Sequence, residues 1–172
     1  MDRYRDLYED SEWTDIQQVC LNGHLITEYA VSQPSTKRKH CPDCGEVTLM
    51  ACPKCNTDLR GHRHIPGVVV LATVSVGKIC PDCGSPYPWA EAARAAAREW
   101  VGSLSALTEA SKEELGRLLV DIFSDTPRTR LACHRLKKFL SEMPADEAQP
   151  FVETLLDAAG PSASEQLRNL RG

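Results

Sequence analysis

The stretch HCPDCGEVTLMACPKC (residues 40–55) holds two Cys-Pro-x-Cys pairs that lie only seven residues apart. A third Cys-x-x-Cys pair follows them, and the turn CLNGH (residues 20–24), with a cysteine and a histidine at its ends, precedes them. Each of these turns offers two ligands, and a tetrahedral zinc ion takes four. The four half-sites therefore predict two metal sites. Their ligands are Cys20, His24, Cys41, Cys44, Cys52, Cys55, Cys80 and Cys83.

Four half-sites can be paired in three ways. The sequential pairing leaves residues 25–40 and 56–79 as the loops of two zinc ribbons, and each loop can form a hairpin. The interleaved pairing is the cross-brace of RING-like modules. The third pairing closes one site across the seven residues 45–51 and the other across the long loop 25–79, which has a larger entropic cost. We expect the sequential pairing, although counting residues does not exclude the cross-brace.

The residues inside and after the pairs favour metal turns over redox chemistry. A proline lies inside all three Cys-x-x-Cys pairs, and Gly45, Asn56 or Gly84 follows the second cysteine. Glycine and asparagine tolerate the left-handed backbone that ends such a turn. Because protein ligands fill all four positions, the two Zn²⁺ ions are expected to be structural, with no open position for a catalytic water. No catalytic residue is predicted.

Near residue 88 the sequence changes from cysteine pairs and β-prone runs to a helical apolar period. We expect an acidic arm or helix over residues 1–18, a β-rich tandem zinc-ribbon module over 19–87 and an α-helical bundle over 88–172, hence an α+β fold. The run from Val68 to Val76 predicts a long strand, since β-branched residues favour strands.

Period-3.6 apolar patterns predict four helices after Pro88. The first has Trp89, Ala93, Ala96, Trp100, Leu104 and Leu107 on one face; the second opens on a capping box, Ser111 to Glu114. Thr126-Pro127 opens the third, with Leu131, Leu136, Phe139, Leu140 and Met143 inward, and Pro150 breaks or begins the fourth. The tail from Pro161 is expected to fray.

The charge balance of the cysteine-rich region argues against a function that depends on binding phosphate groups. Residues 20–84 carry seven Lys or Arg against five Asp or Glu, and two Zn²⁺ with seven thiolates bring the formal charge to about −1. We therefore expect a non-catalytic protein-interaction or adaptor protein, with nucleic-acid binding or a cross-braced ligase-like recruitment module as alternatives. The candidate binding surface comprises Lys37, Arg38, Lys39, Arg60 and Arg63.

The acidic N-terminus lacks the apolar stretch of a signal peptide, and the longest apolar run, residues 65–77, is too short to span a bilayer. We expect a cytoplasmic protein without a membrane partner, in which the eight cysteines stay reduced. The oligomeric state does not follow from the sequence.

The motifs CLNGH, HCPDCG, ACPKC, LRGHRHIPGV and CPDCGSPYPWAEAA follow one another along the chain. In this order they resemble an uncharacterised bacterial family of zinc-ribbon proteins, defined only as a domain of unknown function. The likeness covers roughly residues 18–92 and, more loosely, the helices with their SDTPRTRLA segment. It implies two ligand pairs in each ribbon and transfers no activity.

Overall fold

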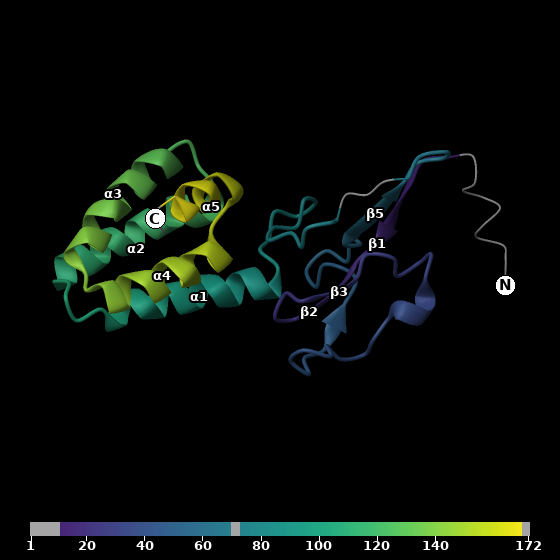
Figure 1. The fold of residues 1–172 in the computed structure, drawn as a ribbon, viewed down its shortest axis with the longest axis horizontal. Coiled ribbons are helices and arrows are strands. Elements are labelled where there is room, and N and C mark those ends of the chain that lie inside the picture. The colour runs from purple at the N-terminus through teal and green to yellow at the C-terminus, as the bar shows by residue number, and fades with distance from the viewer. Residues whose placement is uncertain (1–10, 70–72, 170–172) are drawn as a thin grey trace. The chain divides into compact units, whose positions relative to one another are not determined.

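The computed structural model describes residues 11–69 and 73–169. The chain divides into two compact units, Met1–Trp89 and Ala90–Gly172. Short strands and two cysteine clusters lie in the first unit, and helices make up the second (Figure 1), so the fold is α+β as expected. Within the described ranges, no helix has the length and apolar character to cross a membrane.

Two small antiparallel sheets form the framework of the first unit in its described residues. Strand β1 (Trp13–Ile16) pairs with β5 (Arg60–His64). The other sheet has the order β3-β2-β4 and consists of β2 (Gln18–Cys20), β3 (Leu25–Thr27) and β4 (Thr48–Leu49). Cys20, at the end of β2, lies opposite Thr48 of β4, which brings two ligand turns that are far apart in the sequence to the same end of this sheet.

The acidic arm or helix expected over residues 1–18 differs from what the structure shows. Residues 1–10 lie outside the described ranges, but Trp13–Ile16 is strand β1 and the chain enters β2 at Gln18. Asp15 is buried, because its carboxylate accepts hydrogen bonds from the backbone N–H groups of Ile16, Val31 and Ser32. An acidic residue thus helps to hold this strand in place.

The Val-rich segment also differs from the expected strand. Residues 70–72 lie outside the described ranges, and no strand is assigned to the described residues between Val68 and Val76. Val68 and Val69 are 57% and 83% exposed. Strand β5, with its two histidines, pairs with β1 instead. Gly61 allows β5 to pack this closely against its surroundings, because a Cβ there would lie 2.4 Å from the carbonyl oxygen of Glu28.

Five helices lie in the described part of the second unit, apart from the first two residues of α1. They are α1 (Pro88–Ser103), α2 (Glu109–Ser124), α3 (Thr129–Glu142), α4 (Ala145–Ala158) and α5 (Pro161–Arg168). Their apolar faces meet in one core cluster, which includes Val101, Leu115, Leu119, Ile122, Leu136, Phe151, Leu155 and Leu167. The buried residues of α2 are Leu115, Leu118, Leu119, Ile122 and Phe123, which recur with the helical apolar period.

Helix starts are shifted relative to the sequence patterns. Helix α2 begins at Glu109, and the side chain of Thr108 accepts the hydrogen bond from the N–H of Ser111 (3.2 Å). Ser111 is therefore the third helical residue and not the cap. Helix α3 begins at Thr129, after the Thr126 hydroxyl has accepted a bond from the N–H of Arg128 (3.1 Å). A hydroxyl–amide bond thus caps α2, whereas the N-cap residue of α3, Arg128, forms no side-chain cap.

Other details of the helical prediction need correction. Helix α1 ends at Ser103, so Leu104 is buried in the connection that follows, and Leu131 is 45% exposed rather than inward. Helix α4 already begins at Ala145 and contains Pro150 within it. Helix α5 does not fray but packs against α3 and α4, with Leu167 fully buried.

Candidate metal centres

Each Cys-x-x-Cys pair forms the same local turn, here called a knuckle. The N–H of the residue after the second cysteine donates to the carbonyl of the first: Gly45 to Cys41 (2.9 Å), Asn56 to Cys52 (2.8 Å) and Gly84 to Cys80 (3.0 Å). Those three donors have φ of 76°, 62° and 70°. This left-handed conformation is why glycine or asparagine occupies these positions.

The fourth half-site is the turn between β2 and β3. The N–H of Cys20 donates to the carbonyl of His24 (3.0 Å), and the N–H of Gly23 donates back to Cys20 (2.9 Å). Gly23 has φ 87°, and a Cβ there would lie 3.1 Å from the Trp89 side chain. The indole N–H of Trp89 donates to the carbonyl of Gly77 (2.8 Å), so this ring braces the turn.

The first two half-sites close into one ligand set. The Cys20 and Cys44 sulfurs are 3.8 Å apart, and the Cys41 sulfur lies 3.5 Å from Nδ1 of His24. A tetrahedral ion with Zn–S bonds near 2.3 Å and a Zn–N bond near 2.0 Å needs separations of about 3.8 Å and about 3.5 Å. These two separations match those of a tetrahedral zinc site, so the four ligand atoms could hold one metal ion.

The second set has four cysteines. The sulfurs of Cys52 and Cys83 are 3.9 Å apart, and those of Cys55 and Cys80 are 3.5 Å apart. The ligand atoms within each of the two sets all lie within 4.8 Å of one another, so each set could hold a metal ion.

The structure has the sequential pairing. The cross-brace and the pairing of Cys41/Cys44 with Cys52/Cys55 do not occur, because β4 lies between these two knuckles and pairs with β2. The two pairs of the 40–55 stretch therefore belong to different sites. Val19 of β2 lies opposite Leu49 of β4, and this contact fixes which half-sites meet.

One cysteine of each set is exposed to solvent. Cys44 and Cys83 are exposed, whereas Cys20, Cys41, Cys52 and Cys80 are buried. A backbone hydrogen bond from Cys83 lowers the pKa of the Cys80 thiol to about 6, and one from Glu46 lowers the pKa of Cys44 to about 7. Backbone amides thus favour the thiolate, which is the form that binds metal.

Thiols that share a site oppose one another's ionisation. Hydrogen bonds involving Thr57 lower the pKa of Cys55, but burial and the neighbouring Cys80 and Cys83 outweigh them and raise it to about 11. Without metal, at least one thiol of the second set is protonated at neutral pH. A bound cation removes this repulsion, so binding must release protons.

The predicted basic surface residues lie on two segments. Lys37, Arg38 and Lys39 are exposed in the loop after a short 3-10 helix (Pro34–Thr36), and Nη1 of Arg38 donates to the carbonyls of Ser35 and Lys37. Arg60 and Arg63 lie on β5, where the guanidinium of Arg63 donates from Nε to Glu12 (2.7 Å).

Two histidines that the sequence analysis did not assign, His62 and His64, lie on β5 and contact buried or partly buried carboxylates. Nδ1 of His62 lies 3.6 Å from a Glu28 carboxylate oxygen, and Nε2 of His64 lies 3.3 Å from the buried Asp15 carboxylate. The His64 ring stacks on Trp13 at 4.2 Å. The signal was the alternation in Gly-His-Arg-His, which puts both imidazoles on one face of a strand.

These features define a mixed α+β protein with two sites that could each hold a metal ion, one made of three cysteines and a histidine and the other of four cysteines. Residues 13–167 match the model of the family DUF2321, described as an uncharacterized protein conserved in bacteria. The match covers most of the chain, so the protein belongs to this family, and the resemblance drawn from the motifs is confirmed. No curated protein and no solved structure matches the chain.

Proposed function

We propose that this chain is a zinc-binding, non-catalytic adaptor that holds another protein. The observation that carries the proposal is the completeness of both ligand sets, since each brings four protein ligand atoms within 4.8 Å of one another. Structural zinc sites are closed in this way, whereas catalytic sites keep a position for water or substrate. The metals would then stabilise a binding surface and take no part in a reaction.

Zinc is the metal that best suits these ligands. Thiolates and imidazole in a tetrahedral arrangement favour Zn²⁺ over the oxygen-seeking Mg²⁺ and Ca²⁺. Metal analysis of protein purified without added metal should return two zinc ions per chain. Substitution with Co²⁺ should give the absorption bands of tetrahedral sites, with distinct contributions from the set that includes His24 and the set made only of cysteines.

A protein partner suits the exposed residues better than nucleic acid does. Glu12 partly neutralises Arg63, and Arg38 uses one guanidinium nitrogen to bond its own loop. Lys37 and Lys39 are therefore the cations of this loop with the most freedom to meet a phosphate. Nucleic-acid binders that rely on phosphate contacts usually carry a clearer surplus of positive charge.

The test compares two kinds of partner on one set of variants. The full zinc-loaded chain captures partners from nuclease-treated host lysate, using wild type, Lys37→Ala/Arg38→Ala/Lys39→Ala, and Arg117→Ala as a control on the exposed face of α2. We expect one protein to be retained by wild type and the control and lost by the triple variant.

In parallel, mixed-sequence DNA and RNA are titrated at low and physiological salt. Sub-micromolar affinity that falls steeply with salt and disappears in the triple variant would replace the adaptor role with nucleic-acid binding. Three consecutive exposed basic residues, Lys37–Lys39, are the observation that favours nucleic-acid binding as the second candidate function.

A further inference from the structure

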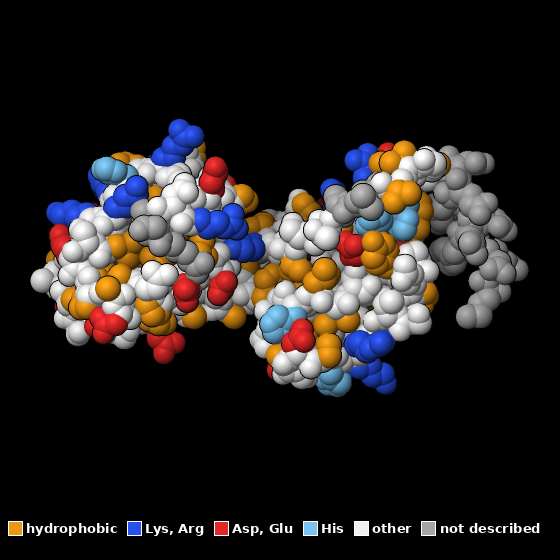
Figure 2. All heavy atoms as spheres, viewed as in Figure 1, with side chains coloured by type: hydrophobic (Ala, Val, Ile, Leu, Met, Phe, Trp, Pro, Cys, Tyr) orange, Lys and Arg blue, Asp and Glu red, His pale blue; other side chains and the backbone are white. Residues whose placement is uncertain are grey.

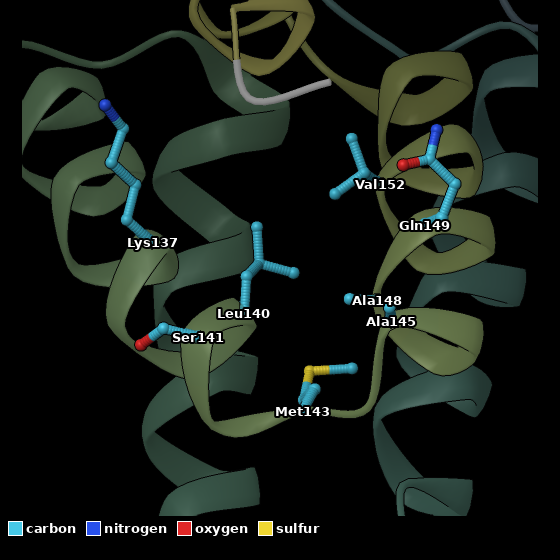
Figure 3. Close-up of a pocket in the computed structure, with 8 residues that line it drawn as sticks. All are labelled: Lys137, Leu140, Ser141, Met143, Ala145, Ala148, Gln149 and Val152. Carbon is cyan, nitrogen blue, oxygen red and sulfur yellow. The ribbon is translucent and has the colours of Figure 1, made fainter. Parts of the chain in front are cut away.

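A groove runs between α3 and α4 in the second unit. It has a volume of about 440 Å³ and is lined by Lys137, Leu140, Ser141, Met143, Ala145, Ala148, Gln149 and Val152. Leu140 of α3 and Val152 of α4 point into the space between the helices, and Met143 lies where the two helices connect (Figure 3). The groove therefore has an apolar floor and one end bounded by the α3–α4 connection.

The two edges of this groove differ in charge. Lys137 is the one charged residue among its eight lining residues, and it belongs to α3. Arg130 lies two helical turns before Lys137, so both side chains follow the same edge of α3. The opposite edge, on α4, carries the neutral Gln149 (Figure 3), and the exposed Asp146 and Glu153 lie one helical turn before and after it.

Helix α3 as a whole is basic on a chain of net charge −4. Arg130, Arg135, Lys137 and Lys138 are all exposed, and none of them forms an ion pair within the described residues. In Figure 2, Lys and Arg side chains lie along α3 and near α5, and several Asp and Glu side chains lie over α1 and α4. These cations without ion-pair partners lie beside an apolar groove. A ligand that carries negative charge would therefore complement this surface.

We infer that the α3–α4 groove binds an acidic amphipathic helix of a partner protein. Helices that lie in such grooves insert apolar side chains spaced i, i+3 or i+4, and i+7. In this groove those side chains would contact Leu140, Met143 and Val152, and carboxylates on the flank would face Arg130 and Lys137. The inference rests on the proposed function as a protein-binding adaptor. It adds a second binding surface and specifies that the partner segment is acidic and amphipathic.

The apolar floor distinguishes this occupant from other anions. A nucleic-acid backbone has phosphates for Arg130 and Lys137 but no apolar side chains for Leu140 and Val152. An anionic membrane is a broad surface, whereas the apolar residues here lie recessed between two helices, with Val152 only 4% exposed. Charge and apolar contact together favour a peptide.

The test uses two synthetic peptides of about 15 residues, long enough to be partly helical. Both carry Leu at i, i+3, i+4 and i+7, and their remaining positions are Glu and Gln in one and Lys and Gln in the other. Fluorescence anisotropy with the full zinc-loaded chain should show that the Glu peptide binds at least about tenfold more tightly than the Lys peptide.

Charge reversal identifies the surface. Arg130→Glu/Lys137→Glu should weaken the Glu peptide by about tenfold and strengthen the Lys peptide, because the flanking contacts change sign. Arg117→Glu on the exposed face of α2 is the matched control and should leave both affinities unchanged. Ala148→Phe, which fills the groove without altering charge, should weaken the Glu peptide, and the helical circular dichroism of each variant checks its fold.

Equal binding of the two peptides, no binding of either, or affinities unaffected by the double reversal would overturn the groove assignment. So would amide shifts on α3 and α4 caused by single-stranded RNA or phosphatidylglycerol vesicles but not by the Glu peptide. These results leave the proposed function separately testable, because its capture experiment depends on Lys37–Lys39 in the other unit.

Discussion

Metal removal should unfold the first unit and spare the second. Apart from ligand cysteines, the buried apolar residues described in Met1–Trp89 are few: Val19, Ala30, Leu59, Tyr87 and Trp89. The core cluster of the helical unit contains twenty buried residues among those described. The two units therefore differ in what can stabilise them, because the first has little apolar core and two ligand sets that could each hold a metal ion.

The magnitudes favour metal over packing in the first unit. Burying a side chain such as Val19 or Leu59 contributes about 1.5–3 kcal/mol. A structural zinc site contributes about 10–16 kcal/mol of binding free energy at neutral pH. Because whole domains are stable by only about 5–15 kcal/mol, loss of either ion exceeds what the first unit can tolerate.

The three tryptophans provide the assay. Trp13 stacks on His64 and Trp89 packs against Gly23, so both report on the first unit, whereas Trp100 packs against the helical core. In a Trp100→Phe variant, chelation should shift tryptophan emission to the red while circular dichroism in the helical band falls only slightly. Returning zinc should restore the emission.

A parallel loss of both signals on chelation would refute the reasoning, since it would mean that the helices need the metals. Unchanged tryptophan emission after verified metal loss would also refute the reasoning. In that case the few apolar contacts of the first unit would be sufficient to fold it.

Three further predictions concern single groups. Cys80→Ser should reduce the zinc content from two ions to one, while Cys133→Ser, outside both ligand sets, should retain two; equal losses would contradict the assigned ligands. Metal affinity should rise with pH above neutrality, because the pKa of Cys55 is raised to about 11 without metal and its proton must leave; competition with a chelator at several pH values measures this. Asp15→Asn should destabilise the first unit at neutral pH by about 2–3 kcal/mol in chemical denaturation, since it removes a carboxylate that accepts several hydrogen bonds. Burial opposes ionisation of Asp15, but bonds from Ser32, Val31 and Ile16 hold its pKa below the ordinary value, so its contribution is present at neutral pH and disappears only as the pH falls through that lowered pKa.

The features that the sequence predicted well depend on neighbouring residues. The knuckles follow from Cys-x-x-Cys spacing with Gly45, Asn56 or Gly84 behind it, because the turn closes between the first cysteine and the residue after the second. The core face of α2 follows from its apolar period, because a helix has the same repeat wherever it packs. Helix starts were predicted less well, since a nearby hydroxyl such as that of Thr108 can take over the cap.

The tertiary structure decided what residues far apart in the sequence do. Local propensity does not select Arg60–His64 as a strand; its pairing depends on β1 as its partner and on the close approach of Gly61 to Glu28. The choice between sequential and cross-braced ligands likewise depends on β2 lying beside β4. By itself, the sequence determined that four ligand pairs and a set of amphipathic helices exist. Which pairs would share a metal depends on long-range contacts. Such contacts are fixed only when the whole chain packs.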